Sequence, residues 1–215
     1  MNEYLKVNEK VYNQLAEEYL LRREKPSKFE EATEYLGNSV FKYISKKSQK
    51  NVLEIGPGAG QILSYFEKKG CRTIGIELSK NMADVAKQYS PQSIIINDDA
   101  NNVDLLDNQF QLVYMGALIH LFPQSDARKL LLKVWKWLEK EGVIFINTTC
   151  HSCSSEGFYE KKDYDGKHMR FRRYWTEREF EEFVISCGFS IIEKLYTNES
   201  NRDKRWIALI GKKEN

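Results

Sequence analysis

Short apolar runs alternate with longer amphipathic segments through the middle of the chain. The runs expected to form strands are residues 51–55, 72–76, 94–96, 110–115 and 143–146. Helices are expected between them, one opening at the cap residue Ser79 and another spanning about 125–139. Strands that alternate with helices form a mostly parallel sheet with helices on both faces, because each connection crosses over the sheet. The alternation therefore predicts an α/β domain.

The C-terminal part of the chain breaks this alternation. A helix is expected over about 176–187, followed by two apolar runs at 189–192 and 206–210. About 13 residues separate these two runs, too few for a helical crossover with its turns, so they are expected to pair antiparallel. The whole pattern predicts a Rossmann-like, doubly wound, mostly parallel seven-stranded sheet with an antiparallel C-terminal edge.

The first part of the chain is polar and helical in pattern. One helix carries apolar and aromatic residues at helical spacing, namely Val11, Tyr12, Leu15, Ala16 and Tyr19, and a second is expected over about 29–44. We expect a single domain made of an N-terminal helical cap over 1–47, a cofactor-binding core over 48–149, a substrate cover over 150–175, and a closing helix and strands over 176–215.

Composition narrows the class of protein. Lysine and arginine number 33 against 31 acidic residues, a net charge of +2 that argues against a protein coating a polyanion. No apolar run approaches the roughly 20 residues that span a bilayer, and the N-terminus lacks the apolar core of a secretion signal. We therefore expect a soluble cytoplasmic protein without membrane contacts. Cys150 and Cys153 flank His151 without a second ligand pair, so no metal site is expected. Nothing in the sequence predicts an oligomeric state.

A glycine-rich loop is the strongest local signal. Gly56, Gly58 and Gly60 follow the first strand and precede a helix, whose N-terminal N–H groups favour an anionic ligand. Glu77 ends the next strand, 21 positions after Gly56, where a carboxylate can accept hydrogen bonds from ribose hydroxyls. Two alternatives are a turn without a ligand and a nicotinamide-binding domain, whose fingerprint needs glycine where Gln61 stands.

Further motifs follow this loop in order. They are Glu54 before the loop, Asn97–Ala100 after the third strand, Asn108–Tyr114 around the fourth, and Leu138–Gly142 before the fifth. With Tyr12–Tyr19 near the start, they resemble class I S-adenosylmethionine-dependent methyltransferases over about residues 50–149. Two positions depart from the family pattern: Gln111 stands in place of an acid, and Val143 in place of a second glycine.

This resemblance implies S-adenosylmethionine as cofactor, released as S-adenosylhomocysteine. The glycines would hold the methionine moiety, Glu77 the ribose, and either Asp98 or Asp99 the adenine amino group. The positions that match the family's cofactor contacts are Glu54, Gly56, Gly58, Gly60, Glu77, Leu78, Asp98, Asp99, Ala100, Met115 and Gly116.

Methyl transfer needs an aligned acceptor and a site closed to water. The N-terminal cap can close over the cofactor with Tyr12, Tyr19 and Arg23, although both tyrosines can instead pack on the flank of the sheet. The aromatic segment 150–175 is expected to cover the substrate. Its candidate contacts are His151, Tyr159, Tyr164, Arg172 and Tyr174.

Residues 161–173 hold six basic and two acidic side chains, a local charge of +4. This excess favours an acidic substrate or RNA phosphates, with a solvated charged hairpin as the alternative.

His120 follows the fourth strand at the carboxyl edge of the sheet, where ligands bind in such folds. It is the candidate general base, and the alternative is a hydrogen-bonded loop histidine. The sequence thus predicts an enzyme that transfers a methyl group to oxygen, nitrogen or sulfur of a small molecule by in-line displacement. The alternatives are a tRNA methyltransferase with the same core and a non-enzymatic cofactor-binding module.

Overall fold

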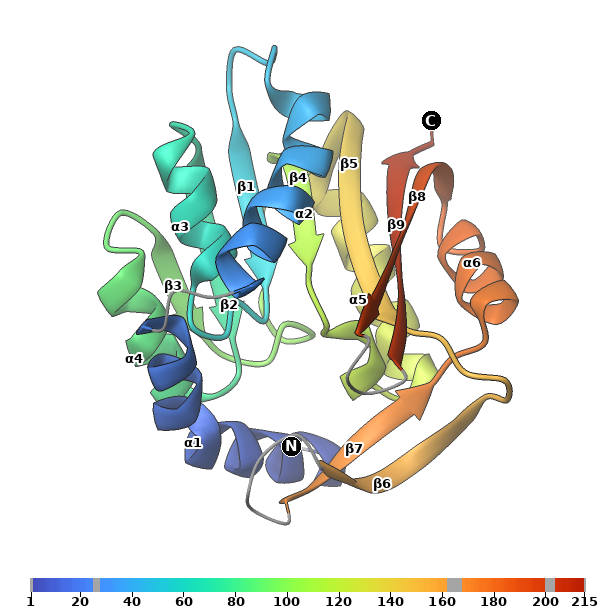
Figure 1. Ribbon diagram of the computed structural model, residues 1–215. Coiled ribbons are helices and arrows are strands. Elements are labelled where there is room, and N and C mark those ends of the chain that lie inside the picture. Colours follow the sequence, from blue (N-terminus) through green and yellow to red (C-terminus); the bar gives the residue numbers. More distant parts are fainter. Residues whose placement is uncertain (1, 25–27, 162–167, 200–203, 215) are drawn as a thin grey trace.

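The computed structural model describes residues 2–24, 28–161, 168–199 and 204–214. Within these residues one sheet has seven strands, in the order β3-β2-β1-β4-β5-β9-β8 (Figure 1). Strands β1 to β5 are parallel, and β9 pairs antiparallel with both β5 and β8. The strands are β1 Asn51–Ile55, β2 Arg72–Glu77, β3 Ile94–Asn97, β4 Phe110–Met115, β5 Leu138–Thr149, β8 Phe189–Glu199 and β9 Lys204–Lys213. The predicted seven-stranded, mostly parallel sheet with an antiparallel edge is confirmed.

Helices cover both faces of this sheet. They are α1 Glu3–Glu24, α2 Lys28–Ile44, α3 Gln61–Lys68, α4 Lys80–Tyr89, α5 Gln124–Trp137 and α6 Glu177–Ile185, with a short 3₁₀ helix η1 at Ile119–Leu121. Alternate strand residues form two apolar clusters, because successive side chains of a strand point to opposite faces. One cluster joins the sheet to α2 and α3, and the other joins it to α5 and α6.

Local chemistry explains where these elements begin and end. The Ser79 hydroxyl accepts a hydrogen bond from the Met82 N–H, so α4 starts where the cap residue predicted. Thr176 caps α6 in the same way. Strands β5, β8 and β9 extend well beyond their apolar runs, because backbone pairing continues past the apolar residues. The end of β8 is largely exposed, whereas Asn147, Thr148 and Thr149 at the end of β5 are buried. The predicted strand ends were therefore too short at this edge.

Gln111, one of the two departures from the family pattern, accepts a hydrogen bond from the first residue of β1. Its side-chain oxygen accepts from the Asn51 N–H at 2.7 Å, and its amide nitrogen donates to a Glu139 carboxylate oxygen at 2.6 Å. A carboxylate at this position has no proton to donate to Glu139. The amide therefore suits this position.

A second, two-stranded sheet lies in the segment expected to cover the substrate. Strands β6 Ser155–Lys161 and β7 His168–Tyr174 pair antiparallel as a hairpin apart from the main sheet. Figure 1 shows this hairpin and α1 lying together across the end of the sheet where β4 points. The segment is thus a hairpin, as the charged-hairpin alternative has it, but the described basic side chains are not solvated: Lys161, Arg170, Arg172 and Arg173 are all less than 9% exposed. The other charged residues of 161–173 lie outside the described residues.

Asn8 fixes the N-terminal half of α1 to the hairpin and to η1. Its side-chain oxygen accepts from the Phe171 N–H at 2.8 Å, and its amide nitrogen donates to the Leu121 carbonyl at 3.1 Å. Tyr4, one turn earlier, packs its ring 5.4 Å from that of Phe171 and donates its hydroxyl to Asp126. These buried contacts link three segments that are distant in sequence.

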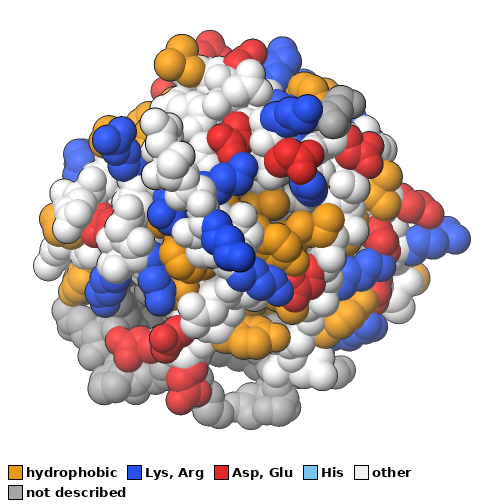
Figure 2. Space-filling model, turned by 90° about the horizontal axis from the view of Figure 1, so that it is seen from above, with side chains coloured by type: hydrophobic (Ala, Val, Ile, Leu, Met, Phe, Trp, Pro, Cys, Tyr) orange, Lys and Arg blue, Asp and Glu red, His pale blue; other side chains and the backbone are white. Residues whose placement is uncertain are grey.

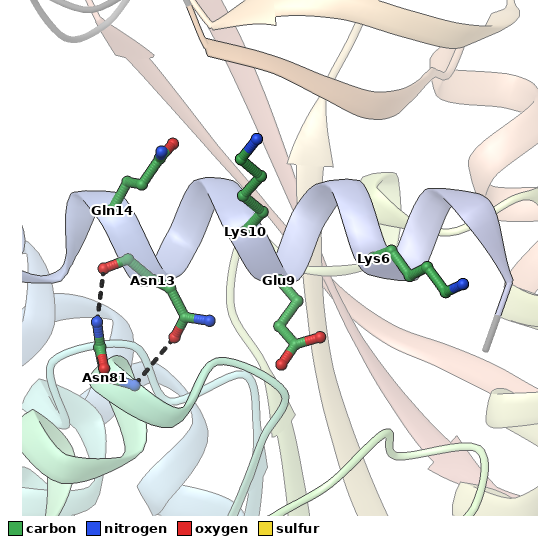
Figure 3. A pocket seen from close by; sticks show the side chains of 6 residues that line it. All are labelled: Lys6, Glu9, Lys10, Asn13, Gln14 and Asn81. Atoms are coloured by element: carbon green, nitrogen blue, oxygen red, sulfur yellow. Dashed lines mark hydrogen bonds between the residues drawn. The ribbon is translucent and has the colours of Figure 1, made fainter.

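Asn13 fixes the C-terminal half of α1 to α4. Its side-chain oxygen accepts from the Ser79 hydroxyl at 2.8 Å and from the Asn81 N–H at 3.1 Å. Its backbone carbonyl accepts from the Asn81 side chain at 3.0 Å, while Gln14 points away from α4 (Figure 3). The open depression along this side of α1, about 460 Å³, is lined by none of the predicted site residues.

Asn13→Ala removes the acceptor for two hydrogen bonds at the start of α4 and is expected to lower the free energy of unfolding by about 1–2 kcal/mol. Hydrogen exchange along α1 should also become faster. Gln14→Ala is the matched control, because that exposed side chain lies one position further on and does not contact α4. Urea denaturation and exchange mass spectrometry measure both effects, and equal losses in the two variants would contradict the assigned role of Asn13.

Candidate active site

The Glu77 carboxylate lies against the glycine loop at the carboxyl end of β2. Its two oxygens accept from the Gly58 N–H at 3.2 Å and from the Ser79 N–H at 2.9 Å. Burial raises the pKa of this carboxyl to about 7, although the N–H groups of Ser79 and Gly58 act in the opposite direction. The acid and the glycine loop that the sequence paired are thus in direct contact.

The three glycines of the loop have different structural roles. Gly58 has a φ of +53°, and a methyl group added there would meet no described atom within 4 Å beyond the chain neighbours. A Cβ at Gly60 would lie 3.0 Å from the Ser90 hydroxyl and 3.2 Å from Ala86, so this glycine allows α4 to approach. Gly56 is packed against Leu118. The resemblance implied one role for all three glycines, whereas among them only Gly58 has open space around an added Cβ.

The two adjacent aspartates after β3 are placed differently. Asp98 is exposed, and one of its oxygens accepts the N–H of Asp99 at 2.7 Å. Asp99 is buried, and it accepts the Asn101 N–H at 3.0 Å. Burial also raises the pKa of the Asp99 carboxyl. Of the two candidates, Asp99 is the one that faces the interior.

The remaining predicted cofactor contacts lie at the same edge of the sheet. Leu78 is half-buried after β2, Ala100 is buried after Asp99, and Met115 is buried at the end of β4 beside the half-buried Gly116. Glu54 is buried on β1, in register with Tyr114 on β4.

Two asparagines that sequence analysis did not single out hold these loops. The Asn97 amide donates to the carbonyls of Glu77 and Leu78, at 2.8 and 3.0 Å. Asn147 accepts the N–H of Ala117, whose φ is +53°, and so fixes the turn after β4. Asn97 ends β3, which pairs with β2, and Asn147 lies near the carboxyl end of β5, which pairs with β4. In each case the neighbouring strand, β2 or β4, leads into the loop that the asparagine holds. That position is the only signal by which the sequence could have suggested them.

His120 is buried in η1, with its Nδ1 atom 3.3 Å from the Thr148 hydroxyl. Burial lowers the pKa of its imidazole well below the usual range, and the positive charges of Arg172, Arg170, Lys161 and His151 add to this effect. The ring is therefore neutral near pH 7 and able to accept a proton.

A second set of hydrogen-bonded side chains joins the end of β5 to the hairpin. Arg172 donates to the Thr149 hydroxyl at 2.7 Å, and that oxygen lies 2.9 Å from Nε2 of His151. Because arginine only donates, the Thr149 hydroxyl is free to donate its proton to Nε2. The His151 ring packs 4.4 Å from Tyr174, which in turn packs 4.7 Å from Tyr159. The structure thus brings together four of the five predicted substrate contacts, and Tyr164 lies outside the described residues.

The predicted contacts on α1 face the hairpin and α4. The Tyr12 hydroxyl accepts from Arg170 at 2.7 Å, which connects α1 to β7. Tyr12 and Tyr19 also pack on an apolar cluster that includes Leu15 and Met82, as the flank-packing alternative predicts. The side chain of Arg23 lies outside the described part of the structure.

The described residues hold neither a metal-ligand cluster nor a helix that could span a membrane. They contain no group of three or more His, Cys, Asp or Glu side chains arranged to hold a metal ion. None of the described helices combines the length and apolar character needed to cross a bilayer.

The central part of the chain is similar in sequence to known methyltransferases. Residues 53–146 match the family described as methyltransferase domain. The phosphoethanolamine N-methyltransferase of Plasmodium falciparum is 28% identical over 156 residues, which cover 68% of this chain and 56% of that protein. The chain therefore spans about half the length of this relative.

Solved structures share the whole fold. The 1,6-didemethyltoxoflavin-N1-methyltransferase of Burkholderia thailandensis, solved with its substrate and S-adenosylhomocysteine, has a TM-score of 0.76 and 15% identity, covering 100% of this chain and 92% of its own. The [4+2]-cyclase SpnF has a TM-score of 0.64 and 13% identity, covering 83% and 80%. The middle of the chain thus matches a methyltransferase domain, and the fold is the one that these solved structures share.

The raised pKa of Glu77 predicts a pH-dependent stability. Between about pH 4.5 and 7, folded Glu77 holds a proton that the unfolded chain has released, so stability falls as the pH rises through this window. Glu77→Gln should lose less free energy of unfolding than the wild type between pH 5 and 7.5. Urea denaturation at both pH values measures this, and Glu182→Gln, at an exposed site, is the control that should follow the wild type. Equal pH dependence in Glu77→Gln and the wild type would contradict the assignment.

Proposed function

We propose that this chain is an S-adenosylmethionine-dependent methyltransferase that acts on a small molecule. The observation that carries the proposal is the buried Glu77 carboxylate beside the open space at Gly58. Ribose hydroxyls need a charged acceptor of this kind, and the methionine moiety needs a close approach to backbone. The residues present fit this cofactor.

The other proposed cofactor contacts lie at the same carboxyl edge of the sheet as Glu77 and Gly58. Asp99 is proposed to accept from the adenine amino group, with the Ala100 N–H facing a ring nitrogen and Leu78 against the ring. Met115 and Gly116 would border the adenosine and the sulfur. Glu54 supports the loop from below. Tyr12, Tyr19 and Arg23 are proposed to close the site from α1.

S-adenosylmethionine supplies a methyl group that is already activated for displacement. The task of this chain is therefore to orient the acceptor and to exclude water. The helix α1 and the hairpin lie across the site and are fixed to each other by Asn8 and Tyr12. Neutral His120 is proposed to accept the proton that the acceptor loses.

A nitrogen acceptor is favoured over oxygen or sulfur, because both named methyltransferases above are N-methyltransferases. We also propose a cytoplasmic location, which suits the free thiols of all four cysteines. Fold alone does not decide the reaction, since a cyclase shares this architecture.

Calorimetry with S-adenosylmethionine and S-adenosylhomocysteine tests the proposal. We expect both to bind, and the proposal is wrong if neither binds tighter than millimolar to the folded protein. Incubation with methyl-labelled cofactor and a cell extract then identifies the acceptor. Label in small molecules supports the proposal, label in tRNA supports the tRNA methyltransferase alternative, and binding without transfer supports a non-enzymatic module.

Gly58→Val should nearly abolish binding of S-adenosylhomocysteine, because the side chain would occupy the open space that the cofactor needs. Gly70→Val is the matched control. Gly70 has a similarly left-handed φ of +75° and no described atom within 4 Å of an added Cβ, but it lies in the turn after α3. Both variants should lose similar stability in a thermal melt. Equal loss of affinity in calorimetry would show that backbone strain, rather than filled space, is responsible.

His120→Gln should lower kcat for the identified acceptor by about 100-fold, the usual contribution of a general base, while the affinity for S-adenosylhomocysteine stays unchanged. Steady-state kinetics and calorimetry measure the two effects. A variant that is less stable but turns over normally would assign His120 a structural role.

A further inference from the structure

Three buried basic side chains share one face of the hairpin. Strand register pairs Lys161 with His168 and Tyr159 with Arg170, and alternation along β7 then places Arg172 on that same face. Their exposed fractions are 4% for Lys161, 6% for Arg170 and 8% for Arg172. Burial of three cations on one face of a two-stranded sheet is unusual, because such residues are almost always exposed.

These cations face the region between η1, β5 and α1. Arg172 reaches the Thr149 hydroxyl at the end of β5, and Arg170 reaches the Tyr12 hydroxyl on α1. Their charges also act on His120, whose pKa they lower. The positive charge therefore gathers beside the residue proposed to receive the acceptor's proton.

Arg173 has a different role, although it is also buried. It lies on the opposite face of β7 and forms ion pairs with Glu156 and Glu179. Its guanidinium packs 4.3 Å from the centre of the Trp175 ring. Arg173 holds the hairpin to α6 and is not part of the inward-facing group.

We propose that Lys161, Arg170 and Arg172 form a subsite for an anionic group, a phosphate or a carboxylate, carried by the methyl acceptor. This inference rests on the proposed function, because the acceptor must lie between the cofactor and the hairpin. A guanidinium has five N–H donors, so it can hold a neutral hydroxyl and a two-oxygen anion together. The acceptor would place its nucleophilic atom towards His120 and its anion against the hairpin.

Burial also decides between the two partners that the basic segment suggested. RNA phosphates bind cations displayed on a surface, whereas these three are less than 9% exposed. Figure 2 shows the end of the molecule opposite the hairpin, and there basic and acidic side chains are interspersed and form no continuous basic surface. The geometry favours a small anion enclosed beneath the cover.

Calorimetric titration of the full chain with inorganic phosphate and with acetate, with and without S-adenosylhomocysteine, tests the subsite. We expect saturable binding of at least one anion, weakened at least tenfold in Arg172→Gln and in Arg170→Gln. Tighter phosphate than acetate binding assigns a phosphate, and the reverse assigns a carboxylate. Arg178→Gln is the control, because Arg178 is 88% exposed and lies on α6.

The outcomes separate the two proposals. Binding of S-adenosylhomocysteine without binding of either anion above chloride would overturn the subsite and leave the proposed function intact. Binding of an anion without binding of S-adenosylhomocysteine would overturn the proposed function alone. Anion binding that survives both arginine substitutions, or that bulk tRNA displaces, would also overturn the subsite. Arg172→Lys keeps the positive charge and serves as the more conservative variant if Arg172→Gln does not fold. If no variant folds, the titration of the wild-type protein alone still shows whether an anion binds.

Phosphoethanolamine and ethanolamine form a second probe pair, since they share the same amine and differ by the phosphate. If the anion is a phosphate, only phosphoethanolamine should compete with inorganic phosphate in the wild-type protein. Equal competition by both compounds would show that the hairpin does not recognise the anion.

Discussion

The hydrogen bonds of the Glu77 carboxylate with the Gly58 and Ser79 N–H groups determine much of the site. They hold the glycine loop after β1 and the loop after β2 at one point, where two parallel strands end side by side. Burial raises the pKa of the carboxyl to about 7, which shows that these two hydrogen bonds offset only part of the cost of burying its charge. In the proposed complex, the two ribose hydroxyls would add hydrogen bonds to those that the Gly58 and Ser79 N–H groups already donate.

Hydrogen bonds of two asparagines fix α1 across the same edge of the sheet. Asn13 fixes α1 to the start of α4, and Asn8 fixes it to the hairpin and to η1. Residues from the first helix, the fourth strand's exit and the hairpin therefore meet around His120. We propose that this arrangement, and not the fold, determines which reaction the chain catalyses, because methyltransferases and a cyclase share the fold.

The sequence predicted the sheet, the start of α4 at Ser79, and the contact between the glycine loop and Glu77. Apolar periodicity and turn residues act locally, so these features are visible without the structure. The hairpin entered the sequence analysis only as an alternative, and as a solvated one, because its inward-facing residues include Arg170 and Arg172 and so hide the apolar-polar alternation. The roles of Asn8 and Asn147 were also missed, since a single amide carries no local sign of a partner distant in sequence.

The central claim is that the cofactor lies over Gly58, with its ribose at Glu77. A crystal structure of the complex with S-adenosylhomocysteine tests this most directly. The account predicts density for both ribose hydroxyls at the Glu77 carboxylate, adenine beside Leu78 and Asp99, and the sulfur directed towards the space between His120 and the hairpin. Density elsewhere, for example in the open depression along α1, with an empty glycine loop, would contradict it.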